Sequence, residues 1–407
     1  MGGGWQHGAV TRRTSALLLL GLVLLSFNLR PAAVSVGPVL DEVRAGLSMS
    51  AAAAGLLTSL PVLAFAGFGA VAPALARRAG IHRVTLGALV AVVAGLAGRA
   101  VVDQSAPFLL LSMVALAGMA AANVLLPSLV KLHFADRVGA VTALYTTALA
   151  IGLTASLVLT VPIAEAAGTW RAGLGAWAVL ALVAALPWLG LIAHDRAPEA
   201  APQTVRFLDV ARTPLGWAMA VFFGLQSIQA YVVFGWFPTL WRDAGYSPTA
   251  AGLLVGVVAA VSIPLSLWLP RLVARTTHPA RLVLAVIACY PAGYLAVLLA
   301  PHDLAIPAAL LIGAGASVFP VVLTLIGLRS RTPAGTAALS GFTQSVGYLI
   351  AGVGPFGFGL VHDLTDGWTV PLLVLIALLV PLAAVAAYAA RPAHVEDQLP
   401  RLEAAAQ

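Results

Sequence analysis

Long runs of apolar residues alternate with short polar segments along the whole chain. Because an α-helix rises 1.5 Å per residue, about 20 apolar residues are needed to cross the hydrocarbon core of a bilayer. The runs are continuous, whereas the strands of an outer-membrane barrel would alternate over about ten residues. The pattern therefore predicts an all-α membrane protein with twelve transmembrane helices, at residues 15–40, 51–76, 84–102, 107–132, 139–162, 170–193, 216–241, 248–270, 281–300, 305–328, 336–361 and 368–390.

The only long connection between the runs divides them into two sets of six. The sets repeat in sequence, since residues 46–57 and 245–254 both contain Gly-x-Ser and then Ala-Gly-Leu-Leu. Parallel six-helix repeats are typical of transporters whose substrate site lies between the halves near the midplane. We predict two pseudo-symmetric six-helix bundles at residues 15–193 and 216–390, a cytoplasmic central loop at 194–215, and cytoplasmic tails at 1–14 and 391–407.

Composition and charge support a membrane location. The chain is 61% hydrophobic and 9% charged, which is too little polar surface for a soluble domain. Its net charge of +7 is spread over short loops and does not form the basic face that nucleic acid requires. Cytoplasmic loops collect Lys and Arg. Seventeen basic residues fall on one side of the predicted membrane, and four fall on the other: Arg44, Arg99, Arg171 and Arg242. We therefore expect a protein of the cell membrane with both termini in the cytoplasm.

One basic residue, Arg30, is left over from this division, because it falls a little past the middle of the first predicted span and not near its end. A cation there costs at least ~2.5–3.5 kcal/mol on insertion scales, so it must face protein or water. No Asp or Glu is predicted inside a span as its permanent partner. We expect Arg30 to face substrate; the alternative is that it holds the bundle together. Pro31 should loosen the helix at this point, and Asn28 can share a cavity with Arg30 only if the turn is distorted; otherwise Asn28 bonds to a neighbouring helix.

Other polar residues lie in the middle of spans, several of them on shared helix faces by i, i+3 and i+4 spacing. Each alone suits hydrogen bonding between helices. Together, uncharged hydrogen-bonding groups around one guanidinium indicate a site for a small monoanion or a polar neutral molecule, because Arg presents a planar fork of donors. The candidate substrate-binding residues are Arg30, Asn28, Asn123, Tyr145, Gln226, Gln229, Gln344 and Tyr348.

No enzyme or metal motif is found. The eight histidines lie in tails, loops or span ends without the spacing of a zinc pair, and no phosphate-binding Gly-x-x-x-x-Gly-Lys run occurs. His133, near the inner end of the fourth span, is the one histidine beside a predicted cavity helix. We expect no enzyme activity, no cofactor and no metal. The expected partners are a small solute and the lipid bilayer, and the expected state is a monomer.

Three motifs carry a family resemblance that covers almost the whole chain. Residues 27–38, Phe-Asn-Leu-Arg-Pro-Ala-Ala-Val-Ser-Val-Gly-Pro, resemble the signature of the cyanate and nitroimidazole transporter branch (CynX/NimT) of the major facilitator superfamily. Residues 319–330 and 339–348 agree with it. The resemblance implies that spans one, four, seven and ten line a central path, that spans five, eight and eleven complete it, and that Arg30 and Asn28 bind substrate.

The loop between spans two and three departs from the superfamily pattern. Arg77 stands where most members carry an Asp, so the usual charge relay of that loop does not transfer. The resemblance implies a secondary or facilitative transporter that works by alternating access on a small anionic or polar, cyanate-like or nitro-heteroaromatic, solute. A multidrug exporter of the same superfamily is the alternative, and a membrane-embedded enzyme is a weaker one.

Overall fold

The computed structural model describes residues 12–49, 51–195 and 205–399, and within these ranges the chain is helical with no strand. Twelve described segments are long and apolar enough to cross a membrane, which confirms the predicted fold class. The first half contains α1 (Arg12–Leu29), α2 (Pro31–Val34), η1 (Gly37–Val39), α3 (Leu40–Gly46), α4 (Ala51–Ala79), α5 (Ile81–Arg99), α6 (Ser105–His133), η2 (Ala135–Arg137), α7 (Val138–Ala167), α8 (Trp170–Leu191) and η3 (Ile192–His194). The second contains α9 (Phe207–Val210), α10 (Pro214–Asp243), α11 (Pro248–Arg275), α12 (Pro279–Ile287), α13 (Cys289–Leu299), α14 (Ala305–Ala316), α15 (Val318–Leu328), α16 (Pro333–Thr365), α17 (Thr369–Ala389) and η4 (Val395–Gln398).

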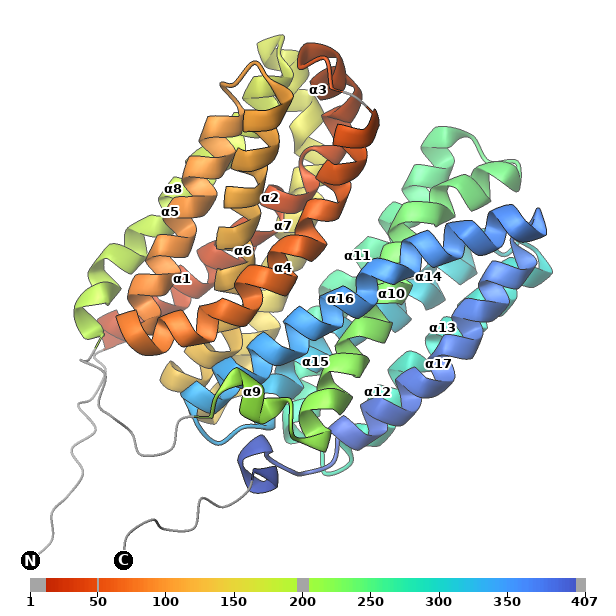
Figure 1. Cartoon of the computed structure of the whole chain (residues 1–407). Helices are drawn as coiled ribbons and strands as arrows, with labels where there is room; N and C mark the ends of the chain where they lie inside the picture. The colour runs from red at the N-terminus through yellow and green to blue at the C-terminus, as the bar shows by residue number, and fades with distance from the viewer. Residues whose placement is uncertain (1–11, 50, 196–204, 400–407) are drawn as a thin grey trace, which may run out of the picture.

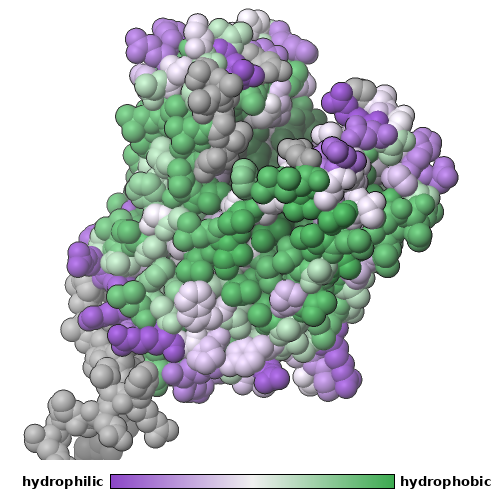
Figure 2. Space-filling model, turned by 45° about the vertical axis from the view of Figure 1, so that its right-hand side comes forward, coloured by the Kyte–Doolittle hydropathy of each residue, from purple (hydrophilic) through white to green (hydrophobic). Residues whose placement is uncertain are grey.

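The helices form two bundles that lean against each other (Figure 1). Helices α1–α8 pack mainly on one another, as do α10–α17, and the two groups meet chiefly through α4 with α16 and α7 with α11. A band of hydrophobic residues crosses the visible face between two hydrophilic ends (Figure 2). We call the end with Arg78, Lys131, Arg275 and Arg331 the basic end, and the end with Asp103, Glu165, Asp243 and Asp303 the acidic end.

Local sequence determines where several helices begin. The side chains of Thr213 and Thr332 accept hydrogen bonds from the backbone N–H groups of Gly216 and Gly335, at 3.1 and 3.0 Å. A proline follows each of these threonines at the first helical position, where its missing N–H is harmless. Helices α10 and α16, which carry most of the candidate residues of the C-terminal half, therefore have well-defined starts.

The first span is interrupted at the point where proline was expected to disturb it. α1 ends at Leu29 and α2 begins at Pro31, so Arg30 lies in the break. Pro31 cannot donate to the carbonyl of Phe27, and that carbonyl packs so closely on α7 that a Cβ at Gly152 would collide with it. The tenth span is interrupted too, between α14 and α15 at Ser317.

One prediction about charge is wrong. Arg99 was counted with the basic residues of the external side, which left Arg30 as the one buried charge, but Arg99 is the last residue of α5 and only 1% exposed. It folds inward because its Nη1 and Nη2 donate to Ala32 O at 3.1 Å and Ser35 Oγ at 2.8 Å, which lie just beyond the break in the first span. Arg30 is therefore not the single basic residue within the protein interior. Two residues counted for the basic side, Arg196 and Arg401, lie outside the described ranges.

At the basic end, Asp195 supplies a carboxylate to the loop in which Arg77 replaces the customary acid. It accepts from the backbone N–H groups of His82 and Arg83 at 3.1 and 2.9 Å, at the start of α5. The His82 ring contacts Asp195 through Nδ1 at 2.7 Å and His133 through Nε2 at 2.8 Å. His133 is therefore part of a histidine pair that joins α5, α6 and the end of η3.

Candidate functional site

The two bundles are in contact at the basic end. Ser128 Oγ of α6 donates to Pro333 O at 2.6 Å, next to the start of α16. A Cβ at Gly139, near the start of α7, would collide with the backbone of α11 at Pro270. Nearer the centre, Ser345 Oγ of α16 donates to Phe65 O of α4 at 3.1 Å. These contacts join the half of each helix that ends in the basic loops. At the acidic end the two lobes are visibly separated (Figure 2).

Two of the predicted substrate residues bond to each other across this contact. Asn123 Nδ2 of α6 donates to Gln344 Oε1 of α16 at 2.5 Å, and Gln344 Nε2 donates to Ser340 Oγ at 2.8 Å. Both amide side chains are buried, at 2% and 0% exposure. The pair is a polar connection between the bundles, and we call it the inter-bundle amide pair.

Arg30 lies where the two bundles face each other. Its side chain is half-buried, and its guanidinium carbon lies 5.3 Å from the centre of the Phe319 ring, in cation–π contact. The guanidinium also lies close to the hydroxyl of Tyr348. Arg30 comes from the break in the first span, and Phe319 lies two residues after the break in the tenth. The first and tenth spans, two of the three interrupted spans in the described ranges, therefore direct a side chain to the same place, as discontinuous helices do in transporter sites.

Aromatic rings surround this place. Tyr348 of α16 lies 3.9 Å from Phe65 of α4, 5.0 Å from Phe223 and 6.5 Å from Tyr231 between ring centres. Phe223 in turn lies 6.0 Å from Phe319. We call the whole set the aromatic site, and it consists of Arg30, Phe65, Phe223, Tyr231, Phe319 and Tyr348.

The electrostatics of the aromatic site are those of an uncompensated cation. Among the described residues, no carboxylate forms an ion pair with Arg30. The ion pairs there are made by other basic residues: His82, Arg171, His302, Arg331 and His394. The polar neighbours of Arg30 are the hydroxyls of Tyr231 and Tyr348, which carry no charge near neutral pH. The site therefore offers one positive charge, two hydroxyl groups and flat apolar surfaces.

The remaining predicted residues are placed differently. Asn28 is 2% exposed, its Nδ2 donates to Leu24 O at 2.8 Å in its own helix, and its Oδ1 has no partner. Tyr145 is buried in α7 with an unpartnered hydroxyl. Gln226 Nε2 donates to Phe223 O at 3.1 Å and to Ser227 Oγ at 2.6 Å.

Gln229 is held inside the C-terminal bundle. Its Nε2 donates to Leu375 O at 3.2 Å, and its Oε1 accepts from Tyr294 at 2.8 Å. Of the eight predicted residues, the structure thus brings Arg30 and Tyr348 together and pairs Asn123 with Gln344. None of the hydrogen bonds described for the other four goes to Arg30.

Sequence reasoning missed Phe65, Phe223, Tyr231 and Phe319. Phenylalanines in an apolar span carry no signal of their own, because they suit lipid and core equally well. The one available signal was Tyr231, which lies in the same span as Gln226 and Gln229 and carries a hydroxyl.

Comparison with known proteins identifies the family of the chain. The Major Facilitator Superfamily profile matches residues 16–355. The chain belongs to the major facilitator superfamily. It is 36% identical over 383 residues to the transporter YycB of Bacillus subtilis, covering 93% of this chain and 94% of that one.

Two Escherichia coli relatives confirm the resemblance to the CynX/NimT branch. The 2-nitroimidazole transporter is 31% identical, covering 90% of this chain and 93% of its own. The cyanate transport protein CynX is 28% identical, covering 86% and 91%. Among solved structures, FucP of E. coli has a TM-score of 0.71 at 16% identity, covers 92% of this chain and 98% of that one, and shares the fold. The protein is thus a solute transporter of the superfamily and not an enzyme.

Proposed function

We propose that the protein carries a small planar monoanion, or a polar heteroaromatic compound with an anionic form, across the cell membrane. The observation that carries this proposal is the aromatic site, where the Arg30 guanidinium stands over Phe319 and beside Tyr348 and pairs with no carboxylate of the described residues. A planar anion can pair with Arg30 through two donors while its faces stack on the rings. Cyanate and 2-nitroimidazole, the compounds that name two relatives, are small and planar and suit such a site.

We further propose that transport proceeds by alternating access. The aromatic site takes Arg30 and Phe65 from the first bundle and Phe223, Phe319 and Tyr348 from the second, so a rocking motion of the bundles would open it to either end. With the basic end in the cytoplasm, as the 17 to 4 division of basic residues predicts, contact at that end corresponds to an outward-facing state.

Binding to purified protein tests the proposal. Thermal-shift titrations with cyanate, 2-nitroimidazole and benzoate should find at least one stabilising ligand, and that ligand should be taken up by proteoliposomes. Arg30→Ala should weaken its binding about tenfold or more, because a charge-assisted hydrogen bond is worth roughly 1.5–3 kcal/mol. Arg30→Lys should keep part of the affinity, because the charge remains while the fork is lost.

Arg44→Ala is the matched control, since Arg44 is an exposed arginine in α3 of the same bundle. Normal ligand binding by folded Arg30→Ala protein would refute the role of Arg30 as the cavity cation. The second candidate, a multidrug exporter, is favoured by the aromatic walls alone. It predicts that lipophilic cations bind as well as anions and that Arg30→Ala improves their binding.

A further inference from the structure

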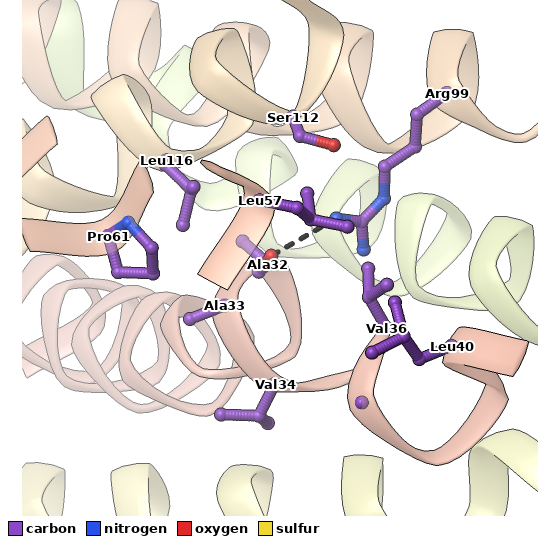
Figure 3. Close-up of a pocket in the computed structure, with 11 residues that line it drawn as sticks. Ala32, Ala33, Val34, Val36, Leu40, Leu57, Pro61, Arg99, Ser112 and Leu116 are labelled. Atoms are coloured by element: carbon purple, nitrogen blue, oxygen red, sulfur yellow. Dashed lines mark hydrogen bonds between the residues drawn. The ribbon is translucent and has the colours of Figure 1, made fainter. Parts of the chain in front are cut away.

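A cavity of about 290 Å³ lies inside the first bundle, on the acidic side of the break in the first span. We call it the Arg99 pocket (Figure 3). Its walls come from α2, η1, α3, α4, α5 and α6, and most of the lining side chains are aliphatic, as with Val34, Leu57 and Leu116. Arg30 is not among the residues that line it, so the pocket is distinct from the aromatic site.

Two buried polar atoms at the wall of this pocket have no hydrogen-bond partner: Arg99 Nε and Ser112 Oγ. The two residues are 1% and 0% exposed. They reach from α5 and α6 toward the same end of the pocket, with the Ser112 hydroxyl directed to the Arg99 side chain (Figure 3). A buried donor left unpaired is costly, so two at one place indicate a bound group.

The positive charge of Arg99 limits which kind of group can be bound there. The other two nitrogens of the Arg99 guanidinium donate to Ala32 O and Ser35 Oγ, which are neutral acceptors. No carboxylate is paired with Arg99 in the ranges that the structure describes. A buried cation is stable only when it is both hydrogen-bonded and compensated. A water molecule would satisfy the donors but would not compensate the charge.

We propose that the Arg99 pocket binds a small monovalent anion between Arg99 Nε and Ser112 Oγ. The pocket offers only these two unpaired donors among apolar walls, so it should select an anion that loses its hydration easily. Bromide and thiocyanate meet this description, whereas fluoride and sulfate are strongly hydrated. A halide and the carboxylate of an organic acid share the required chemistry, and the test separates them.

The full chain, purified in detergent, is tested by the line width of the ⁸¹Br resonance of free bromide, which broadens when bromide exchanges with a protein site. The wild type should broaden the line saturably, and thiocyanate should reverse the broadening while fluoride does not. Ser112→Ala should weaken bromide binding about tenfold, the effect of losing one hydrogen bond to a charged group. Reversal by chloride identifies a halide site, and reversal by benzoate alone identifies a carboxylate site.

Leu116→Phe, which fills the pocket and leaves both donors in place, should also remove the broadening, so the test does not depend on an Arg99 variant that fails to fold. Arg44→Gln should broaden the line as the wild type does, and Ser112→Ala and Leu116→Phe should reduce the broadening in the same way when Arg30→Gln has removed the cation of the aromatic site. Broadening that survives both Ser112→Ala and Leu116→Phe would overturn the proposal. Broadening that is lost in Arg30→Gln alone would place the anion at the aromatic site instead. Loss of transport in Arg30→Gln with bromide binding intact would concern the proposed function only.

Discussion

The inter-bundle amide pair should control the balance between the two transport states. Asn123→Ala removes the donor to Gln344 Oε1, a 2.5 Å bond between residues that are almost completely buried. The carbonyl oxygen of Gln344 is then buried without a partner wherever the bundles remain closed at the basic end, at a cost of roughly 1–3 kcal/mol. In a state open at that end, water can reach the same oxygen. Because about 1.4 kcal/mol is a factor of ten, the population should shift about tenfold or more toward the state open at the basic end.

Distance measurements between spin labels test this expectation. Cysteines at Lys131 and Arg331, in a background with Cys289→Ser, place one label on each bundle at the basic end. Asn123→Ala should lengthen the distance distribution, and Asn123→Ala with Gln344→Ala should restore part of it, because the unsatisfied oxygen is then gone. Gln229→Ala is the control, since it removes a buried glutamine with two hydrogen bonds inside one bundle. If Gln229→Ala lengthens the distance equally, or Asn123→Ala not at all, the amide pair is not a latch.

Three further predictions can be checked directly. Reporter fusions after Arg206 and after Arg401 should read cytoplasmic and one after Asp303 external; an external C-terminus would contradict the proposed orientation. Substrate counterflow in proteoliposomes should persist without a pH gradient and survive His133→Gln, because no carboxylate or histidine is paired with Arg30 among the described residues. If Glu165→Gln abolished pH-driven accumulation while counterflow remained, Glu165 would be the proton carrier and the prediction would be wrong. Tyr348→Phe should weaken anion binding about tenfold while leaving thermal stability near the wild-type value, since the ring and its packing remain.

The length and spacing of the apolar runs are enough to predict the twelve spans, because a bilayer requires every backbone polar group to be paired within a helix. The break at Arg30 was predictable as well, since Pro31 removes one specific hydrogen bond. These features depend on local chemistry alone. The observed helix ends differ from the predicted ones by a few residues; α5, for example, begins at Ile81, whereas the span was predicted to begin at residue 84.

Partners that are distant in sequence were not predictable. The pairing of Asn123 with Gln344 joins residues 221 positions apart, and the sequence of neither helix indicates that the other is its partner. Arg99 was misplaced for a related reason, because a charge at the end of an apolar run normally points to water. Its burial depends on two acceptors of the interrupted first span, the Ala32 carbonyl and the Ser35 hydroxyl, whose position only the folded bundle reveals.

The groups that would bind an anionic substrate are divided between the two bundles. Arg30 belongs to the first bundle, while the ring beneath it and the hydroxyl beside it belong to the second. An anion bound there would therefore hold both bundles at once. The hydrogen bonds of Ser128 with Pro333 and of Asn123 with Gln344, which join the bundles nearer the basic end, are by contrast between neutral groups. Among the described residues, no carboxylate compensates Arg30. The net charge at the centre therefore depends on whether an anionic substrate is bound. Exchange of one anion for another, in which Arg30 is compensated during each crossing, is the transport mode that this arrangement favours.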